Sequence, residues 1–354
     1  ALLKGAALDP GYLIGGVPHD FGRGFTVGQP PYFVVEGDEY DCACFDKRPK
    51  FVHYRPQTLV VTGVEFDHAD IYDDIEQIEA AFAGLLEEMP PRGHVIVAAD
   101  SEIAIKVAKK ASCAVETYAV SPAKEDDLSS TRRLAMPLHW YATYEPIGGG
   151  RQQLKVTHDG EEVGSFEVPM TGAHNMANAL AAIAVAHRLG IGVDTIHRAL
   201  ANFGGVARRQ QIRGVVEGVT VIDDFAHHPT AIRTTLQGLR NRDGRLIAVF
   251  EPRSATSRRA TFQHNFPAAL SSADRIYLAP LFAPERIPEE ERLDVERVAA
   301  DLRAMGRDAA VASSTELASL LAASAEPGDT IVIMSSGSFD NLHERLLAAL
   351  EARA

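Results

Sequence analysis

The sequence of 354 residues is poor in cysteine, in long apolar runs and in surplus positive charge. Its three cysteines, Cys42, Cys44 and Cys113, are too few and too irregularly spaced for a disulfide framework or a four-thiolate zinc site, which indicates a reducing compartment. No apolar run approaches the roughly 20 residues that cross a bilayer, and no secretory signal pattern opens the chain. We therefore expect a cytoplasmic protein with no membrane partner.

The charge balance bears on possible partners. A formal net charge of -13 leaves no basic surplus to displace counterions from a phosphate backbone, so we expect no nucleic acid partner. With 46% hydrophobic and 23% charged residues, the chain can bury two cores of ordinary domain size. The composition predicts a globular protein of two domains and leaves its oligomeric state unspecified.

Short apolar runs alternate with helical patterns along most of the chain. Helical spacing over Ile75–Glu87 precedes the run His94–Ala99, which is typical of a buried strand. The other strand-like runs are Leu59–Val64, Val219–Ile222, Leu246–Phe250, Arg275–Leu278 and Thr330–Met334. Alternating strands and helices predict α/β domains with mainly parallel sheets.

A hairpin and two helices end the first domain. Polar and apolar residues alternate from Leu154 to Val168 around Asp159-Gly160, which predicts an antiparallel hairpin at the edge of that domain. An alanine-rich helix over Asn175–Leu189 and a helix over Val193–Phe203 follow, before Gly204-Gly205. We therefore place one domain at residues 1–206 and a second at residues 207–354.

Two acidic clusters follow predicted strands of the first domain. Residues 36–41 come directly after the strand-like run Tyr32–Val35, and residues 65–70, which include His68, follow the run that ends at Val64. Carboxylates at strand ends can face a ligand crevice, and magnesium takes one or two carboxylates together with substrate phosphates. Solvated turns are the alternative, and the two clusters together leave a shared metal site and a solvated surface equally open.

The start of the alanine-rich helix carries His174, Asn175 and Asn178. Gly172 permits a close turn, and the amides can cap the helix or bond a base. Capping accounts for one asparagine and leaves Asn178 less well explained. In the second domain, Asp223-Asp224 forms an acidic turn after a strand, where paired carboxylates can hold ribose hydroxyls or a metal.

Two further segments follow strands of the second domain. Residues 251–259 carry Arg253, Ser254, Arg258 and Arg259, and guanidinium groups bind phosphate or carboxylate bidentately. A solvated basic helix start is the alternative. Residues 335–340 can present backbone N–H groups to an anion, although a tight turn accounts for them equally well.

The order of these segments resembles the Mur ligase family. The resemblance spans nearly the whole chain and rests on the acidic run from Glu36, Asp67-His68, residues 174–178, Arg208-Arg209 and residues 223–230. It implies a partial central ATPase domain with a mainly parallel sheet, followed by a C-terminal Rossmann-like α/β domain. Within the family, residues 251–254, 257–259 and 337–343 are similar to the branch that attaches a cell-wall peptide.

The resemblance implies an amide-forming ligase that uses ATP and Mg²⁺. ATP would phosphorylate the lactyl carboxylate of UDP-N-acetylmuramate, and the amine of L-alanyl-γ-D-glutamyl-meso-diaminopimelate, a murein tripeptide, would attack the acyl phosphate. This route makes chemical sense because a carboxylate is a poor electrophile, whereas magnesium stabilises the charge on a phosphate leaving group.

Three other interpretations are possible, the first of them a related ligase. One is a ligase that adds L-alanine to UDP-N-acetylmuramate, and the second is a non-catalytic fragment that binds nucleotide or peptide. The third is a metal-dependent hydrolase that uses His68, His227 and His228, which the absence of a His-Glu-x-x-His helix disfavours.

The resemblance also implies residue roles. It makes Glu36, His68 and Arg209 catalytic, with Glu36 and His68 as the magnesium ligands and Arg209 directed at the phosphates. It implies that His174, Asn175 and Asn178 lie near the nucleotide. It also implies that Asp223 or Asp224 holds the ribose. Residues implied in peptide binding are Arg253, for a carboxylate, with Ser254 and Arg258.

Two departures from the family pattern stand out. The family has a Gly-x-x-Gly-Lys-Thr phosphate loop before the early strands of the central domain, and the sequence has neither this loop nor a sugar-nucleotide domain. Because residues 1–8 resemble the end of the helix that follows the loop, we expect an N-terminally incomplete sequence. Gly63 stands where many relatives have Asn, and a small residue there is simply compatible with a tight turn.

Overall fold

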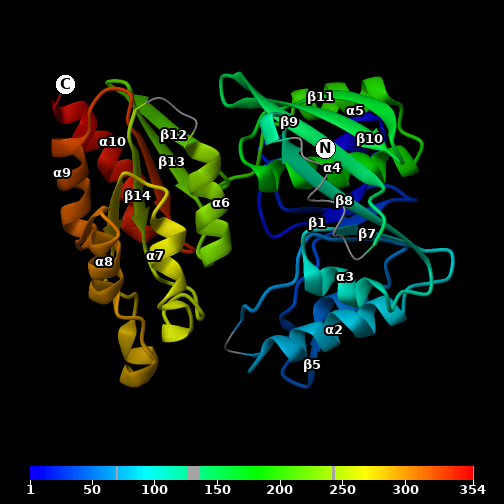
Figure 1. Cartoon of the computed structure of the whole chain (residues 1–354), viewed down its shortest axis with the longest axis horizontal. Coiled ribbons are helices and arrows are strands. Elements are labelled where there is room, and N and C mark those ends of the chain that lie inside the picture. The colour runs from blue at the N-terminus through cyan, green and yellow to red at the C-terminus, as the bar shows by residue number, and fades with distance from the viewer. Residues whose placement is uncertain (69–70, 126–135, 241–243, 354) are drawn as a thin grey trace. The chain divides into compact units, whose positions relative to one another are not determined.

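The computed structural model describes residues 1–68, 71–125, 136–240 and 244–353. They form two compact units, Ala1–Gly205 and Val206–Ala354. Each unit contains a six-stranded, largely parallel sheet with helices (Figure 1), which confirms the predicted α/β class. No helix among the described residues is long and apolar enough to cross a membrane.

The main sheet of the first unit has the strand order β11-β10-β9-β8-β7-β6. Its parallel strands are β6 (Thr58–Val61), β7 (His94–Ala98), β8 (Ala114–Pro122) and β9 (Trp140–Gly148). The antiparallel strands β10 (Arg151–His158) and β11 (Glu161–Val168) extend it to one edge. They confirm the predicted hairpin, whose turn places Asp159 and Gly160 at φ angles of 49° and 84°.

Helices cover this sheet in two layers. They are α1 (Leu2–Gly5), α2 (Ile75–Glu87), α3 (Glu102–Ala108), α4 (Ala173–Arg188) and α5 (Val193–Ala201). Val95 and Val97 of β7 share a core with α2 and α3, whereas Ile96 and Ala98 share one with α1, α4 and α5. Because both faces are buried, β7 is continuously apolar from Val95 to Ala98 instead of alternating with polar residues.

Short strands outside the main sheet carry the first acidic cluster. β1 (Gly11–Leu13), β2 (Phe25–Thr26) and β3 (Phe33–Val35) form a three-stranded sheet, and β4 (Asp41–Ala43) pairs with β5 (Asp46–Pro49). The first acidic cluster therefore follows β3, whereas the second follows β6 of a different sheet. An apolar run is a local signal and does not specify which strands pair.

The sheet of the second unit has the order β12-β13-β17-β14-β15-β16. All its neighbouring strands are parallel except β12, which is an antiparallel edge strand. The strands are β12 (Gln211–Val216), β13 (Val219–Asp224), β14 (Leu246–Phe250), β15 (Arg275–Leu278), β16 (Asp308–Val311) and β17 (Thr330–Met334). Asp223 and Asp224 thus lie within β13, and the prediction of an acidic turn after the strand was wrong.

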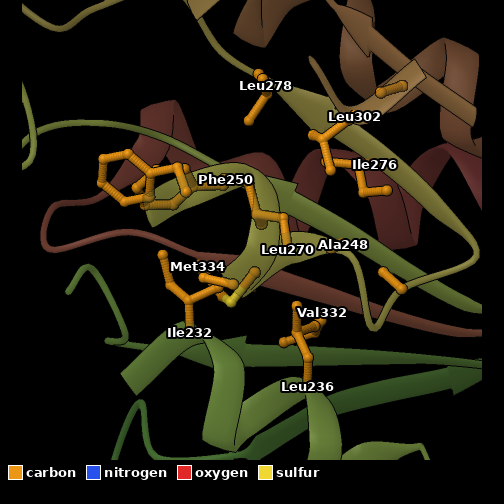
Figure 2. Close-up of a cluster of buried hydrophobic side chains, with 14 of the residues drawn as sticks. Ile232, Leu236, Ala248, Phe250, Leu270, Ile276, Leu278, Leu302, Val332 and Met334 are labelled. Carbon is orange, nitrogen blue, oxygen red and sulfur yellow. The ribbon is translucent and has the colours of Figure 1, made fainter. Parts of the chain in front are cut away.

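The helices of the second unit bury both faces of its sheet. They are α6 (Pro229–Leu239), α7 (Asn265–Leu270), α8 (Val295–Ala304), α9 (Ser314–Ser324) and α10 (Leu342–Arg353). Ala248 and Phe250 of β14 pack among side chains of α6, α7 and α8, including Ile232 and Leu302 (Figure 2). Ile247 and Val249 face α9 and α10. The alternation along β14 therefore divides the unit into two cores.

The order of the strands brings three polar segments to one edge of this sheet. β17 lies between β13 and β14, and Met334 is in register with both Asp224 and Phe250. The segments that follow these parallel strands consequently emerge side by side, although they are far apart in sequence. The carboxyl edge of a doubly wound sheet is where such folds bind ligands.

Candidate functional site

Asp223 is a buried carboxylate surrounded by two arginine side chains and a histidine. Its Oδ1 lies 3.3 Å from Arg208 Nε and 3.4 Å from His343 Nε2, and its Oδ2 lies 3.7 Å from Arg213 Nη1. Burial by itself would raise the pKa of Asp223, but the adjacent His343 and Arg208 side chains outweigh burial and hold the pKa below its ordinary value. Asp223 is therefore an ionised anchor for Arg208.

Asp224 is equally buried but is satisfied mainly by the backbone. Its Oδ2 accepts from the Gln210 N–H at 2.9 Å, and its Oδ1 accepts from the Ala226 N–H at 2.8 Å. Burial raises the pKa of Asp224 above its ordinary value. These bonds fasten the segment at residues 208–210 to β13, and they supply donors to both carboxylate oxygens of Asp224 inside the strand.

We expect Asp224→Ala to loosen this segment locally. The change leaves the N–H groups of half-buried Gln210 and buried Ala226 without their acceptor, and an unsatisfied buried donor costs about 1 to 3 kcal/mol. Amide hydrogen exchange at Gln210 and Ala226 should accelerate correspondingly. The control is Asp308→Ala, which removes a carboxylate with 57% of its side chain exposed and should leave exchange at these two amides unchanged. Unchanged protection in Asp224→Ala would mean that Asp224 does not hold this segment.

Arg208 and Arg209 differ in how they are held. Arg208 Nη2 donates to the carbonyls of Ser335 at 2.5 Å and Gly337 at 2.7 Å, so this side chain joins β13 to the turn after β17. Arg209 is exposed, and its guanidinium lies 5.4 Å from the centre of the Phe225 ring. Arg208 is thus structural, whereas Arg209 can reach a ligand.

The segment after β14 places Arg253 beside a fixed carboxylate. Glu251 is 6% exposed, and its Oε2 accepts from Ser335 Oγ at 2.5 Å. Arg253 Nη1 lies 3.5 Å from Glu251 Oε1, and the Arg253 N–H donates to Ser257 Oγ at 3.1 Å. The edge of the sheet therefore presents a guanidinium beside a carboxylate that is itself bonded to the turn after β17.

Ser254 and Arg258 lie in the same segment but are committed to local bonds. Ser254 Oγ donates to Ser257 Oγ at 2.8 Å, while Arg258 Nη1 donates to the carbonyls of Phe282 at 3.0 Å and Ala283 at 3.2 Å. Burial, and then the nearby Arg286 and Arg259, lower the pKa of Arg258. Their contact with a ligand stays a prediction.

In the first unit, the two acidic clusters meet through His68. Its Nε2 lies 3.8 Å from Glu39 Oε2, and its ring lies edge-on to Tyr40 with 4.3 Å between ring centres. Tyr72 Oη donates to the Glu39 carbonyl at 2.8 Å, which ties the segments together. Residues 69 and 70 of the second cluster lie outside the described residues. The sequence did not indicate that Glu39, instead of Glu36, would be the carboxylate beside His68.

Glu36 makes a different contact. It is exposed, and its Oε2 accepts from the Gly15 N–H at 2.6 Å. This bond fixes Glu36 against the loop after β1, and a Cβ at position 15 would lie 3.3 Å from Glu36 Oε2. Its role as a magnesium ligand stays a prediction.

The predicted nucleotide-contacting residues lie in the first turns of α4. Gly172, at a φ of 94°, is the N-cap residue, and Asn175 Nδ2 donates to the Thr171 carbonyl at 2.8 Å. Asn178 is exposed, and His174 is half-buried. Asn175 thus stabilises the helix start, and Asn178 can reach a ligand.

Several residues of the site were not singled out from sequence. Glu39 and Tyr40 fell inside an acidic run whose individual members look alike, and His343 fell inside a motif that carried no assigned role. Ser335 lies beside Glu251 only because β17 pairs with β14. No local signal could have joined residues so distant in sequence.

The two α/β units, the second with an arginine-rich carboxyl edge, match two domains of one family of ligases. Residues 26–186 match the Mur ligase middle domain, and residues 207–337 match the glutamate ligase domain of Mur ligases. The chain belongs to the Mur ligase family, as its sequence motifs predicted.

Its relatives include peptide ligases and alanine ligases. The UDP-N-acetylmuramate–L-alanyl-γ-D-glutamyl-meso-2,6-diaminoheptandioate ligase of Escherichia coli is 38% identical, over 100% of this chain and 72% of the relative. The enzyme of the same name from Haemophilus influenzae is 36% identical, over 99% and 73%. The UDP-N-acetylmuramate–L-alanine ligase of Phenylobacterium zucineum is 33% identical, over 99% and 71%.

Solved structures support the same grouping. The murein peptide ligase of Psychrobacter arcticus has a TM-score of 0.65 and 33% identity, with 99% of this chain and 73% of that chain covered. The UDP-N-acetylmuramate-alanine ligase of Thermotoga maritima has a TM-score of 0.73 over 100% and 71% of the two chains. Its 20% identity supports the fold alone.

Proposed function

We propose that the protein is a cytoplasmic, ATP-dependent ligase that joins L-alanyl-γ-D-glutamyl-meso-diaminopimelate to UDP-N-acetylmuramate through an acyl phosphate. The single observation that carries this proposal is the 36 to 38% identity, over essentially the whole chain, to two ligases named for these substrates. The alanine ligase is less similar at 33%. A guanidinium at the carboxyl edge of the second sheet suits an amine substrate that bears carboxylates.

Mur ligases use ATP and Mg²⁺, and the first unit offers groups that fit the metal. Among the described residues, no three His, Cys, Asp or Glu side chains are grouped so as to hold a metal ion by themselves. Magnesium commonly keeps waters and binds through one or two protein groups plus substrate phosphates, so a pair of ligands is enough. We propose Glu36 and His68 for this role, and Glu39 is the alternative carboxylate because it lies beside His68.

The other roles are those that the family resemblance implies. We propose that His174, Asn175 and Asn178 lie near the nucleotide and that Asp223 or Asp224 holds its ribose. Exposed Arg209 would neutralise phosphate charge as it develops, which is the principal way proteins accelerate phosphoryl transfer. The ranges 1–206 and 207–354 would be the central ATP-binding and C-terminal domains.

The test is ADP release from ATP with Mg²⁺ and UDP-N-acetylmuramate, comparing the murein tripeptide with L-alanine as the amine. Release that depends on the tripeptide is the expected result. Release that depends on L-alanine would identify an alanine ligase instead. If neither amine supports release, calorimetric titration with ATP and with the tripeptide separates a non-catalytic binding fragment from a protein that recognises neither substrate.

A further inference from the structure

The guanidinium of Arg253 is stacked against an aromatic ring. Its central carbon lies 3.6 Å from the centre of the Phe282 ring, and 23% of the Arg253 side chain remains exposed. A flexible arginine loses rotamer freedom when it binds a ligand, and that loss weakens binding. Stacking on Phe282 fixes the side chain beforehand, so Arg253 can bind without this cost.

Gly337 makes room for the same side chain. A Cβ at this position would lie 2.0 Å from Arg253 Nε, 2.3 Å from its Cδ and 2.4 Å from its Cζ. The φ angle of Gly337 lies outside the left-handed region, so the backbone itself does not require glycine. The Arg253 side chain therefore occupies the space that a side chain at position 337 would need.

Glu251 occupies one end of the guanidinium. Its carboxylate is fixed by Ser335 Oγ on one oxygen and faces Arg253 Nη1 with the other. Within the described part of the chain, Arg253 Nε and Nη2 make no hydrogen bond. These two nitrogens form one edge of a planar fork, the geometry that matches a carboxylate bidentately.

We infer that Phe282, Gly337 and Glu251 are positioning residues that hold Arg253 so that its Nε and Nη2 edge receives a carboxylate of the peptide substrate. The inference rests on the proposed function and adds the means by which the site selects its amine substrate. A rigid fork binds a planar carboxylate in one orientation and discriminates against an uncharged carboxamide, which would present an N–H group to a donor.

The test is calorimetric binding of two ligands to the intact chain: the tripeptide, and the same tripeptide with its carboxylates converted to carboxamides. Phe282→Leu keeps an apolar side chain but removes the ring, whereas Phe282→Tyr keeps the ring. We expect Phe282→Leu to weaken tripeptide binding roughly three- to tenfold without affecting the carboxamide ligand. Phe282→Tyr should bind like the wild type. Because Phe282 is 37% exposed, neither change should prevent folding.

Gly337→Ala supplies an independent variant with a matched control. It should weaken tripeptide binding in the wild-type background and have no further effect in an Arg253→Ala background, where the clash is gone. Equal weakening for the carboxamide ligand, or wild-type affinity in both Phe282→Leu and Gly337→Ala, would overturn the positioning role alone. A wild-type chain that does not bind the tripeptide would overturn the proposed function and this inference with it.

Discussion

A Glu36→Gln, His68→Ala double variant is expected to need at least about a hundredfold more magnesium than the wild type for half-maximal ADP release. Loss of a group that merely orients a metal ligand already lowers affinity roughly 10- to 100-fold, and this change removes both proposed ligands. Glu36→Gln retains the shape of the side chain and one carbonyl oxygen to accept from Gly15, so the loop after β1 should keep its bond. The loss should therefore report metal binding.

The magnesium prediction has a readout that does not depend on turnover. Binding of Mn²⁺ in the presence of ATP, followed by electron paramagnetic resonance, should weaken in the same variant. A Glu39→Gln, His68→Ala variant is the matched comparison, since Glu39 is the carboxylate beside His68. Wild-type metal dependence in the Glu36 variant together with a loss in the Glu39 variant would transfer the role to Glu39. Wild-type behaviour in both would refute a metal site here.

Arg253→Ala is expected to raise the KM for the tripeptide roughly 10- to 150-fold, because a hydrogen bond to a charged group contributes about 1.5 to 3 kcal/mol. The KM for ATP should stay near the wild-type value, since the change affects the amine substrate. Glu251 keeps its bond from Ser335 Oγ in this variant, so the edge of the sheet should remain folded.

Arg253→Lys distinguishes charge from geometry. Lysine preserves the positive charge but lacks the planar fork, so an intermediate KM is expected if the carboxylate is bound bidentately. Steady-state ADP release at varied tripeptide concentration measures both variants. An Arg253→Ala enzyme with an unchanged KM for the tripeptide would remove Arg253 from the peptide site.

The periodicity of the sequence was sufficient to locate several elements. Helix α2 spans Ile75–Glu87, and strands β14, β15 and β17 span Leu246–Phe250, Arg275–Leu278 and Thr330–Met334, as predicted. Burial on both faces makes such strands continuously apolar, and this signal is contained within the strand itself. β6 was less well predicted, since it ends at Val61 although the apolar run continues to Val64.

The extent of β13 could not be foreseen from its own residues. Aspartate is unfavourable in a buried strand, and the sequence accordingly predicted an acidic turn. The strand nevertheless continues through Asp223 and Asp224 because Arg208 and backbone N–H groups donate to their oxygens, and His343 Nε2 lies 3.4 Å from Asp223 Oδ1. These donors come from segments before and long after the strand, so only the folded chain reveals them.

The sequence by itself determined the α/β class, the positions of the principal strands and helices, and the ordered motifs that mark a Mur ligase. Tertiary structure decided which residues lie together: Arg253 with Glu251, Phe282 and Gly337, and His68 with Glu39. The physical reason is that periodicity and turn chemistry act over a few residues, whereas strand order places neighbours from distant parts of the chain at one sheet edge.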